Sequence, residues 1–396
     1  MVIFREMTPE CERWDLNPRT PARLDLKSNS FGRLDTLAWG DVKYPLDYIN
    51  LTYISTWLCT SQYNSRIMPP PFATFSRNVF IPLTNICRNR CGYCGFRRDI
   101  GHHEAKLLTP AEVSDILDRG VRAGCSEALF TFGEHAEEVD GFMSLLQELG
   151  YSSIIDYLAD MCRLSIKKGL LPHSNPGILE KNELEKLKPC NASMGLMLET
   201  TGIIEAHKGC MGKAPALRIK TIRTAGELRI PFTTGILVGI GETPSDRILS
   251  IRAIRDIHEE FGHIQEVIIQ NFIPKPGTGM SSYPPPGIRT MKETVSMARQ
   301  LLPEDVAVQV SPNLISPREL LNCGANDLGG ISPETIDHIN PESAWPTLVE
   351  LHAMAGVLLR ERLPIYPHYV KKKWYSDEMA LLLRSLSDAE GFRKTY

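Results

Sequence analysis

The sequence lacks the features that mark a membrane protein, a secreted protein or a nucleic-acid-binding protein. Its apolar runs are all shorter than a membrane span. Charged residues such as Arg5 and Glu6 stand at the N-terminus, where a signal peptide would carry an apolar core. The formal net charge is only -3, which gives no basic face for nucleic acid. We therefore predict a cytoplasmic protein with no membrane and no nucleic-acid partner.

Cysteine is too scarce for a disulfide scaffold, with ten in 396 residues. Seven of the ten are isolated in the sequence and are interpreted as small core residues or surface thiols. The remaining three, Cys87, Cys91 and Cys94, form a C-x3-C-x2-C pattern directly after the apolar run 78–83. Thiols clustered so tightly are reactive unless a metal or oxidation caps them. This segment is the first candidate site.

Short apolar strands alternate with amphipathic helices through most of the chain. The predicted strands are 78–83, 127–132, 170–174, 192–198, 233–239, 265–272 and 306–311. The predicted helices are 109–123, 214–229, 243–261 and 290–302. Capping residues at Thr109 and Thr243, each followed by proline, support two of these helix starts. The alternation predicts an α/β fold: a parallel sheet closed wholly or partly as a TIM-like (β/α) barrel, with a doubly wound open sheet as the alternative.

The chain divides into three predicted parts. The stiff spacer Met68-Pro69-Pro70-Pro71-Phe72 marks the first boundary. Toward the C-terminus, 327–330 is interpreted as a turn, 345–362 as an amphipathic helix and 371–396 as a charged tail. The parts are an N-terminal extension, partly disordered or packed on the core (1–75), the barrel (76–330) and a C-terminal helical extension (331–396).

Polar residues gather where the predicted strands end. In barrels of this kind, chemistry collects at the carboxyl ends of the strands. The three cysteines follow the first strand, and Gly133 and Glu134 follow the second. The later strand ends carry Glu199, Gly239, Glu242, Gln270, Asn271, Gln309 and Asn313. This edge of the barrel is therefore the predicted location of the site.

Two kinds of metal site could use the three cysteines. Structural zinc usually takes four protein ligands in paired spacings. No second pair follows here, and His102, His103 and Cys125 are isolated candidates. Three thiolates on a loop after a strand fit a [4Fe–4S] cluster with one iron open to an external ligand. We predict this cluster; a non-enzymatic module built on zinc or iron–sulfur is the alternative.

The cysteine pattern, with Tyr93 before its last cysteine, resembles the radical S-adenosylmethionine (SAM) superfamily. The resemblance implies that SAM chelates the open iron through its amino and carboxylate groups. An external one-electron donor reduces the cluster, and cleavage of SAM then yields a 5′-deoxyadenosyl radical that abstracts hydrogen from the substrate. In such enzymes the cofactor supplies the difficult chemistry and the protein supplies orientation.

Further stretches are similar to motifs of the same superfamily. Phe132-Gly133-Glu134 resembles its GGE motif, with Phe132 in place of the first glycine, and implies contact with the methionine amino group. The stretch 235–242 resembles G-x-I-x-G-x-x-E, which supports adenine, and Glu199 stands where a polar residue often contacts the ribose. The implied cofactor-binding residues are Tyr93, Gly133, Glu134, Glu199, Gly235, Gly239 and Glu242.

A narrower resemblance covers roughly residues 76–370. Five stretches resemble the first, ring-closing subunit of the 7,8-didemethyl-8-hydroxy-5-deazariboflavin synthase family. They are 84–98, 127–134, 270–275, 311–314 and 329–333. The resemblance implies a carbon–nitrogen lyase that closes the deazaflavin ring, with loss of ammonia, in coenzyme F-420 biosynthesis. The implied substrate is the 5-amino-5-(4-hydroxybenzyl)-6-(D-ribitylimino)-dihydrouracil adduct, which a partner radical SAM subunit makes.

A ribityl chain and a uracil edge need paired hydrogen-bond donors and acceptors. The candidate substrate-binding residues are Asn175, Gln270, Asn271, Gln309 and Asn313. The alternative for each is an amide that satisfies loop backbone. No catalytic residue is assigned, although Glu199 and His173 are candidates for a general base. The alternative functions are the partner subunit that transfers the hydroxybenzyl group and a menaquinone-pathway relative.

Overall fold

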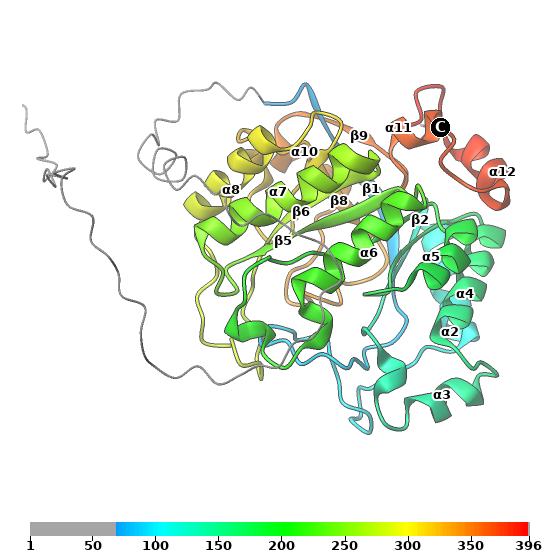
Figure 1. Ribbon diagram of the computed structural model, residues 1–396. Helices are drawn as coiled ribbons and strands as arrows, with labels where there is room; N and C mark the ends of the chain where they lie inside the picture. Colours follow the sequence, from blue (N-terminus) through cyan, green and yellow to red (C-terminus); the bar gives the residue numbers. More distant parts are fainter. Residues whose placement is uncertain (1–68, 395–396) are drawn as a thin grey trace, which may run out of the picture. The chain divides into compact units, whose positions relative to one another are not determined.

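Eight parallel strands close into a barrel in the computed structural model, which describes residues 69–394 (Figure 1). Each strand pairs with the next, and the eighth pairs with the first. The strands are β1 (Phe72–Pro82), β2 (Glu127–Thr131), β3 (Leu171–Asn175), β4 (Ser193–Gly195), β5 (Phe232–Val238), β6 (Ile264–Asn271), β7 (Ala307–Gln309) and β8 (Asp327–Ile331). The predicted α/β barrel is thus confirmed, and its closure is complete.

Helices cover the outside of the barrel (Figure 1). The helices predicted from the sequence are α2 (Pro110–Arg122), α6 (Pro215–Glu227), α7 (Pro244–Phe261) and α8 (Ile288–Leu301). Thr109 and Thr243 form the expected capping boxes. The structure adds α3 (Phe142–Glu148), α4 (Ile154–Lys168), α5 (Lys181–Leu187) and α9 (Pro317–Leu321), while α10 (Leu348–Ala355) lies within the predicted helix 345–362. None of the described helices is long and apolar enough to cross a membrane.

The prediction of a turn at 327–330 is wrong, because these residues lie in β8. Gly329 and Gly330 are typical of a turn, and Gly329 has a left-handed backbone (φ +71°). The strand is therefore not evident from the sequence. β8 pairs with the first half of β1, at Thr74 and Asp327. The three-part division of the chain stays a prediction, but its boundaries at 75 and 330 fall inside β1 and β8. Residues 1–68 of the predicted extension lie outside the described residues.

The prediction of a helix over 345–362 is wrong beyond Ala355. Gly356 ends α10 in a left-handed conformation (φ +68°), which is a common helix C-terminus. The chain then forms β9 (Leu358–Glu361), which pairs with Phe72–Phe75 at the start of β1. The predicted charged tail contains α12 (Asp377–Leu386), preceded by α11 (Pro367–Lys371).

The C-terminal segment closes the amino-terminal end of the barrel. Leu363, Ile365 and Tyr366 pack in one hydrophobic cluster with residues at the starts of the strands, Leu171 and Ala307 among them. α11 and α12 lie at the opposite end of the barrel from α3 (Figure 1). The barrel interior therefore has a floor built by this segment, and its other end stays available for a ligand.

Candidate functional site

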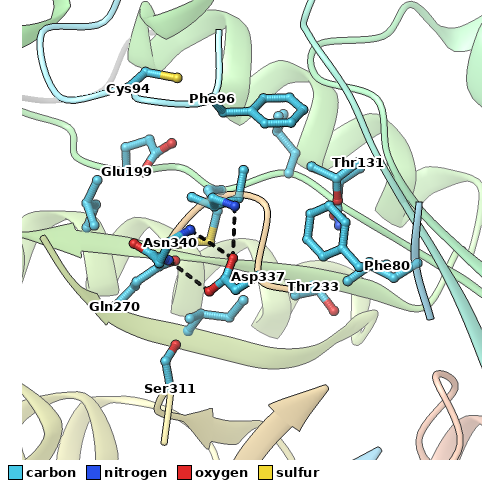
Figure 2. Close-up of a pocket in the computed structure, with 18 of the residues that line it drawn as sticks. Phe80, Cys94, Phe96, Thr131, Glu199, Thr233, Gln270, Ser311, Asp337 and Asn340 are labelled. Atoms are coloured by element: carbon cyan, nitrogen blue, oxygen red, sulfur yellow. Dashed lines mark hydrogen bonds between the residues drawn. The ribbon is translucent and has the colours of Figure 1, made fainter. Parts of the chain in front are cut away.

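A single cavity of about 400 Å³ runs from the cysteine loop into the barrel. Figure 2 shows Cys94 and Phe96 on one side of it and Gln270 and Ser311 on the other. Along β2, Glu127, Leu129 and Thr131 all line the cavity. At a rise of about 3.3 Å per residue, the first and last of these are about 13 Å apart, so the cavity suits an elongated ligand.

The cysteine loop is held at this mouth by backbone hydrogen bonds to two neighbouring loops. The amide of Gly92 donates to the carbonyl of Ala206 (2.8 Å), and the carbonyl of Gly92 accepts from Met280 (2.9 Å). Gly133 lies so close to the loop that a Cβ there would come within 1.9 Å of the Ile86 carbonyl oxygen. The chain therefore requires glycine at 133, as the motif indicates.

The three thiols fit an iron–sulfur cluster better than zinc. Among the described residues, the only three His, Cys, Asp or Glu side chains with ligand atoms all within 4.8 Å of one another are His102, His103 and Glu104. The three sulfurs of the cysteine loop are therefore not all within 4.8 Å of one another, whereas tetrahedral zinc, with Zn–S near 2.3 Å, holds its sulfurs about 3.8 Å apart. Burial raises the pKa of Cys87, helped by the nearby charges of Glu134 and Cys94. Metal binding would therefore displace a proton.

Glu134 follows β2 and is held ionised beside the cysteine loop. Its carboxylate accepts from Asn89 Nδ2 (2.9 Å) and from Arg218 Nη1 (3.0 Å). Burial raises the pKa of Glu134, but the charges of Arg218 and Lys213 outweigh it, and the net shift is downward. An ionised, oriented carboxylate is a good acceptor for an ammonium group.

Glu199 follows β4, and the same two cations, Lys213 and Arg218, lower its pKa. It has a left-handed backbone (φ +66°), and Lys213 Nζ lies 2.7 Å from its Oε1. Burial opposes ionisation, but the charge of Lys213 lowers the pKa of Glu199 overall. A carboxylate with a lowered pKa is a weak base, so the geometry favours binding over proton abstraction for Glu199.

The stretch after β5 mainly shapes its own loop. The Glu242 carboxylate accepts from the amides of Gly239 (3.0 Å) and Ile240 (2.9 Å) and pairs with Arg247 (2.8 Å). At Gly235 a Cβ would come within 2.3 Å of the Ile268 carbonyl oxygen. Gly235, Gly239 and Glu242 are not among the residues that line the cavity, whereas Leu237 is. Their contact with adenine stays a prediction.

Four of the five predicted substrate residues line the cavity: Asn175, Gln270, Asn271 and Gln309. Asn313 is absent from the lining, and its amide donates to Asp337 (3.1 Å) and to the Ser343 carbonyl (3.2 Å). The amide nitrogen of Asn313 thus satisfies loop groups, whereas its Oδ1 is buried without a partner, and contact of Asn313 with the substrate stays a prediction.

His173 lies deeper in the cavity wall. Its Nδ1 is 2.6 Å from Ser193 Oγ, and its Nε2 is 3.3 Å from Asn175 Oδ1. Burial lowers the pKa of His173 to about 4, so the ring is neutral at pH 7. A neutral imidazole can accept a proton, but burial makes it a weak base.

Within the described part of the chain, three cavity-lining side chains carry a buried polar atom that has no hydrogen-bond partner. The atoms are Asn78 Oδ1, Asn271 Oδ1 and Trp345 Nε1. Buried polar groups are almost always paired, so unpaired ones that face a cavity indicate a ligand that would complete them.

The floor of the cavity is a buried ionic network. Arg362 donates to Asp327 (2.7 Å) and to Glu266 (2.8 Å), and all three side chains are at most 7% exposed. Glu266 also accepts from Thr233 (2.9 Å), and Ser76 donates to Glu127. Glu127, Glu266 and Arg362 line the cavity.

The family model described as the Radical SAM superfamily matches residues 81–254. A curated relative from Methanococcoides burtonii, named 7,8-didemethyl-8-hydroxy-5-deazariboflavin synthase, is 61% identical over 82% of this chain and 99% of its own length. A relative of the same name from Archaeoglobus fulgidus is 52% identical over 81% of this chain and 98% of its own. The chain belongs to the 7,8-didemethyl-8-hydroxy-5-deazariboflavin synthase family. This family assigns it to the radical SAM enzymes, whose cofactors are a [4Fe–4S] cluster and SAM.

Solved structures agree with the fold of this synthase-family chain. The [FeFe]-hydrogenase maturase HydG superposes with a TM-score of 0.61 at 16% identity, covering 81% of this chain and 70% of the maturase. Methylornithine synthase superposes with a TM-score of 0.53 at 20% identity, covering 67% of this chain and 74% of that enzyme. At these identities the likeness shows the barrel fold alone.

Several side chains of the deazariboflavin synthase cavity were missed in the sequence. Lys213 lines it from the segment before α6, and Arg218 lines it from α6 itself. Lys275 lines it after β6, with Nζ 2.7 Å from Asn340 Oδ1. Asp337 and Asn340 come from the loop after β8 and are hydrogen-bonded to each other (Figure 2). No local motif marks these residues; only burial of their charges in the fold identifies them.

The floor of this synthase should make stability depend on pH. Burial raises the pKa of Glu127 to about 7, against about 4.5 for an unburied glutamate. The folded state then holds a proton that the unfolded state releases, so stability falls as pH rises between these values. We expect the Glu127→Gln variant to gain about 1–3 kcal/mol over the wild type between pH 5 and pH 8. Urea unfolding of both proteins at the two pH values measures this, and a constant difference would contradict it.

Proposed function

We propose that this chain is the ring-closing subunit, which converts the 5-amino-5-(4-hydroxybenzyl)-6-(D-ribitylimino)-dihydrouracil adduct to 7,8-didemethyl-8-hydroxy-5-deazariboflavin with loss of ammonia. The observation that carries the proposal is one continuous cavity, which leads from the three-cysteine loop past two ionised carboxylates to an amide-lined wall. The relatives are named for the closed-ring product, which favours ring closure over transfer of the hydroxybenzyl group.

Cys87, Cys91 and Cys94 would hold the [4Fe–4S] cluster, and the donor set of three loop thiols fits it. When bound, the cluster and SAM together supply a carbon radical that removes hydrogen from the substrate. Glu134 would accept the SAM ammonium, and Glu199 would accept hydrogen bonds from ribose. Tyr93, whose hydroxyl lies 3.0 Å from His207 Nε2, would help to close the mouth over the cofactor.

The wall would bind the uracil edge of the adduct. Asn271 Oδ1 and Trp345 Nε1 are a buried acceptor and a buried donor without partners. Gln270 and Gln309 add further donors and acceptors on adjacent strands. Burial of Asn271 and Gln309 would exclude water from the reacting ring, which protects a radical from side reactions. Asn175 is held by His173 and would bind the substrate through its amide group.

The proposed reaction requires two partners, an external one-electron donor and the radical SAM subunit that makes the adduct. The exposed rim beside the cysteine loop, with Arg90 68% exposed, would be accessible to a donor protein. We also propose a cytoplasmic location, because the eight cysteines of the described residues are all unpaired thiols and a reducing compartment keeps them so.

The test is turnover of the preformed adduct. The full chain, reconstituted anaerobically with iron and sulfide and reduced with dithionite, should cleave SAM and release ammonia and the fluorescent deazaflavin. SAM cleavage without deazaflavin would reject ring closure and leave a different radical SAM activity. Formation of the adduct from tyrosine and 5-amino-6-(ribitylamino)uracil would instead identify the hydroxybenzyl-transferring subunit. Bound zinc without SAM cleavage would indicate the structural module.

A further inference from the structure

Asn78 carries one of the buried cavity atoms that lack a hydrogen-bond partner. It is 1% exposed, lines the cavity, and its Oδ1 has no hydrogen-bond partner. In the sheet it pairs directly with Glu127 on the neighbouring strand, so the two side chains share one level of the barrel. Gly330 leaves the room that the Asn78 amide occupies, since a Cβ there would lie 2.0 Å from Nδ2.

This level lies far from the cysteine loop. Glu127 and Asn78 stand near the floor, whereas Glu134 and the thiols stand at the mouth, beyond the end of β2. A substrate whose reacting ring lies at the mouth must therefore place another part of its structure here. That part meets the unpaired carbonyl oxygen of Asn78, carboxyl groups and a guanidinium.

The charges at the barrel floor determine which chemical class of substrate group, here called the tail, can bind there. Three carboxyl groups, those of Glu127, Glu266 and Asp327, surround the single guanidinium of Arg362. The guanidinium of Arg362 already donates to Asp327 and Glu266, so little positive charge is left for an anionic tail such as a phosphate, and an alkyl tail would leave buried polar groups unpaired. A neutral tail with several hydroxyl groups can donate to the carboxylates and to Asn78 and can accept from Arg362.

We propose that the barrel floor formed by Asn78, Glu127, Glu266 and Arg362 is a subsite for an unphosphorylated polyol chain of the substrate. The inference rests on the proposed function, in which that chain is the ribityl group of the adduct. Asn78 and Glu127 discriminate between tails, because each lines the cavity and can form hydrogen bonds with hydroxyl groups. Arg362 holds the carboxyl groups of Glu266 and Asp327 in place.

The experiment compares three adducts that share the reacting ring and differ only in the tail: ribityl, ribityl 5-phosphate and unsubstituted pentyl. With the reconstituted full-length protein we expect KM to be at least about tenfold higher for the phosphate and pentyl adducts than for the ribityl adduct. In Asn78→Leu, which keeps the volume and removes the amide, KM for the ribityl adduct should rise about tenfold, while KM for the pentyl adduct should not rise.

Thr234→Val is the matched control. Thr234 Oγ1 is also buried without a partner, but Thr234 does not line the cavity. Its KM values for all three adducts should equal those of the wild type. Equal KM values of the wild type for all three tails, with turnover intact, would overturn the subsite and leave the proposed function standing. No turnover of any adduct would overturn the proposed function and the subsite with it.

A structural role of Asn78 predicts a different pattern. If Asn78 only supports the fold, Asn78→Leu should lower the midpoint of thermal unfolding and impair the ribityl and pentyl adducts alike. That result would also overturn the subsite. A selective loss on the ribityl adduct at an unchanged unfolding midpoint would support it.

Discussion

Alanine at Cys87, Cys91 or Cys94 is expected to abolish SAM cleavage and deazaflavin formation. Each thiolate would hold one iron, and loss of one leaves the cluster without the three protein ligands that a site-differentiated [4Fe–4S] centre requires. The reconstituted wild type should contain about four irons per chain, and its electron paramagnetic resonance spectrum after reduction should change when SAM is added. Each of the three variants should lose both the iron and the spectral change.

Other cysteines of the same chain are the controls. Cys323 is 8% exposed and Cys162 is fully buried beside Ser174, and neither lies on the cysteine loop. Cys210 is the sharper control, because its thiol lies beside that of Cys91. Cys323→Ala, Cys162→Ala and Cys210→Ala should all keep a full complement of iron. Loss of iron in Cys210→Ala would mean that the ligand set differs from the three-cysteine pattern.

Arg362→Met is expected to destabilise the fold by about 3–5 kcal/mol, because it leaves two buried carboxylates without their cation. Arg362 is 3% exposed and donates to both Asp327 and Glu266. These contacts also tie the C-terminal segment to β6 and β8, so their loss should loosen the floor of the barrel. The free energy of unfolding in urea, measured at pH 7, gives the effect directly.

Arg360→Met, two positions earlier, provides the comparison. The Arg360 side chain is 33% exposed, pairs with Asp388 at 3.0 Å and lies over the ring of Phe392. Partly exposed ion pairs contribute little, so we expect a loss of about 1 kcal/mol or less. Equal losses at 360 and 362 would show that burial of the ion pairs does not govern their contribution.

Much of the fold and of the cysteine loop could be predicted from local patterns. The capping boxes at Thr109 and Thr243 identified two helix starts, because a capping residue acts within three residues of itself. Cys87, Cys91 and Cys94 also lie within eight residues, so their pattern can be recognised in the sequence alone. Gly133 could also be found, because its motif follows a strand and the glycine is required by contact with Ile86.

The errors share a physical cause. Local patterns predict a turn where β8 lies and a helix where β9 lies, since a short strand is decided by its neighbours rather than by its own residues. The role of Asn313 is not decided by the pattern either: it follows a strand, but it lies outside the cavity lining and its amide donates to Asp337 and Ser343, so its contact with the substrate stays a prediction. Whether a strand-end amide faces a cavity or satisfies a loop depends on contacts that the pattern does not contain.

The sequence by itself determined the family, the alternation of strands and helices and the residues proposed to hold iron, because each depends on residues close together in the chain. Only the tertiary structure decided which polar groups face the cavity. The pairs Arg218 with Glu134, Lys213 with Glu199 and Arg362 with Asp327 form on folding and leave ionised groups buried in the barrel. Burial makes the charge of each group matter, and burial is a property of the closed barrel rather than of any one segment.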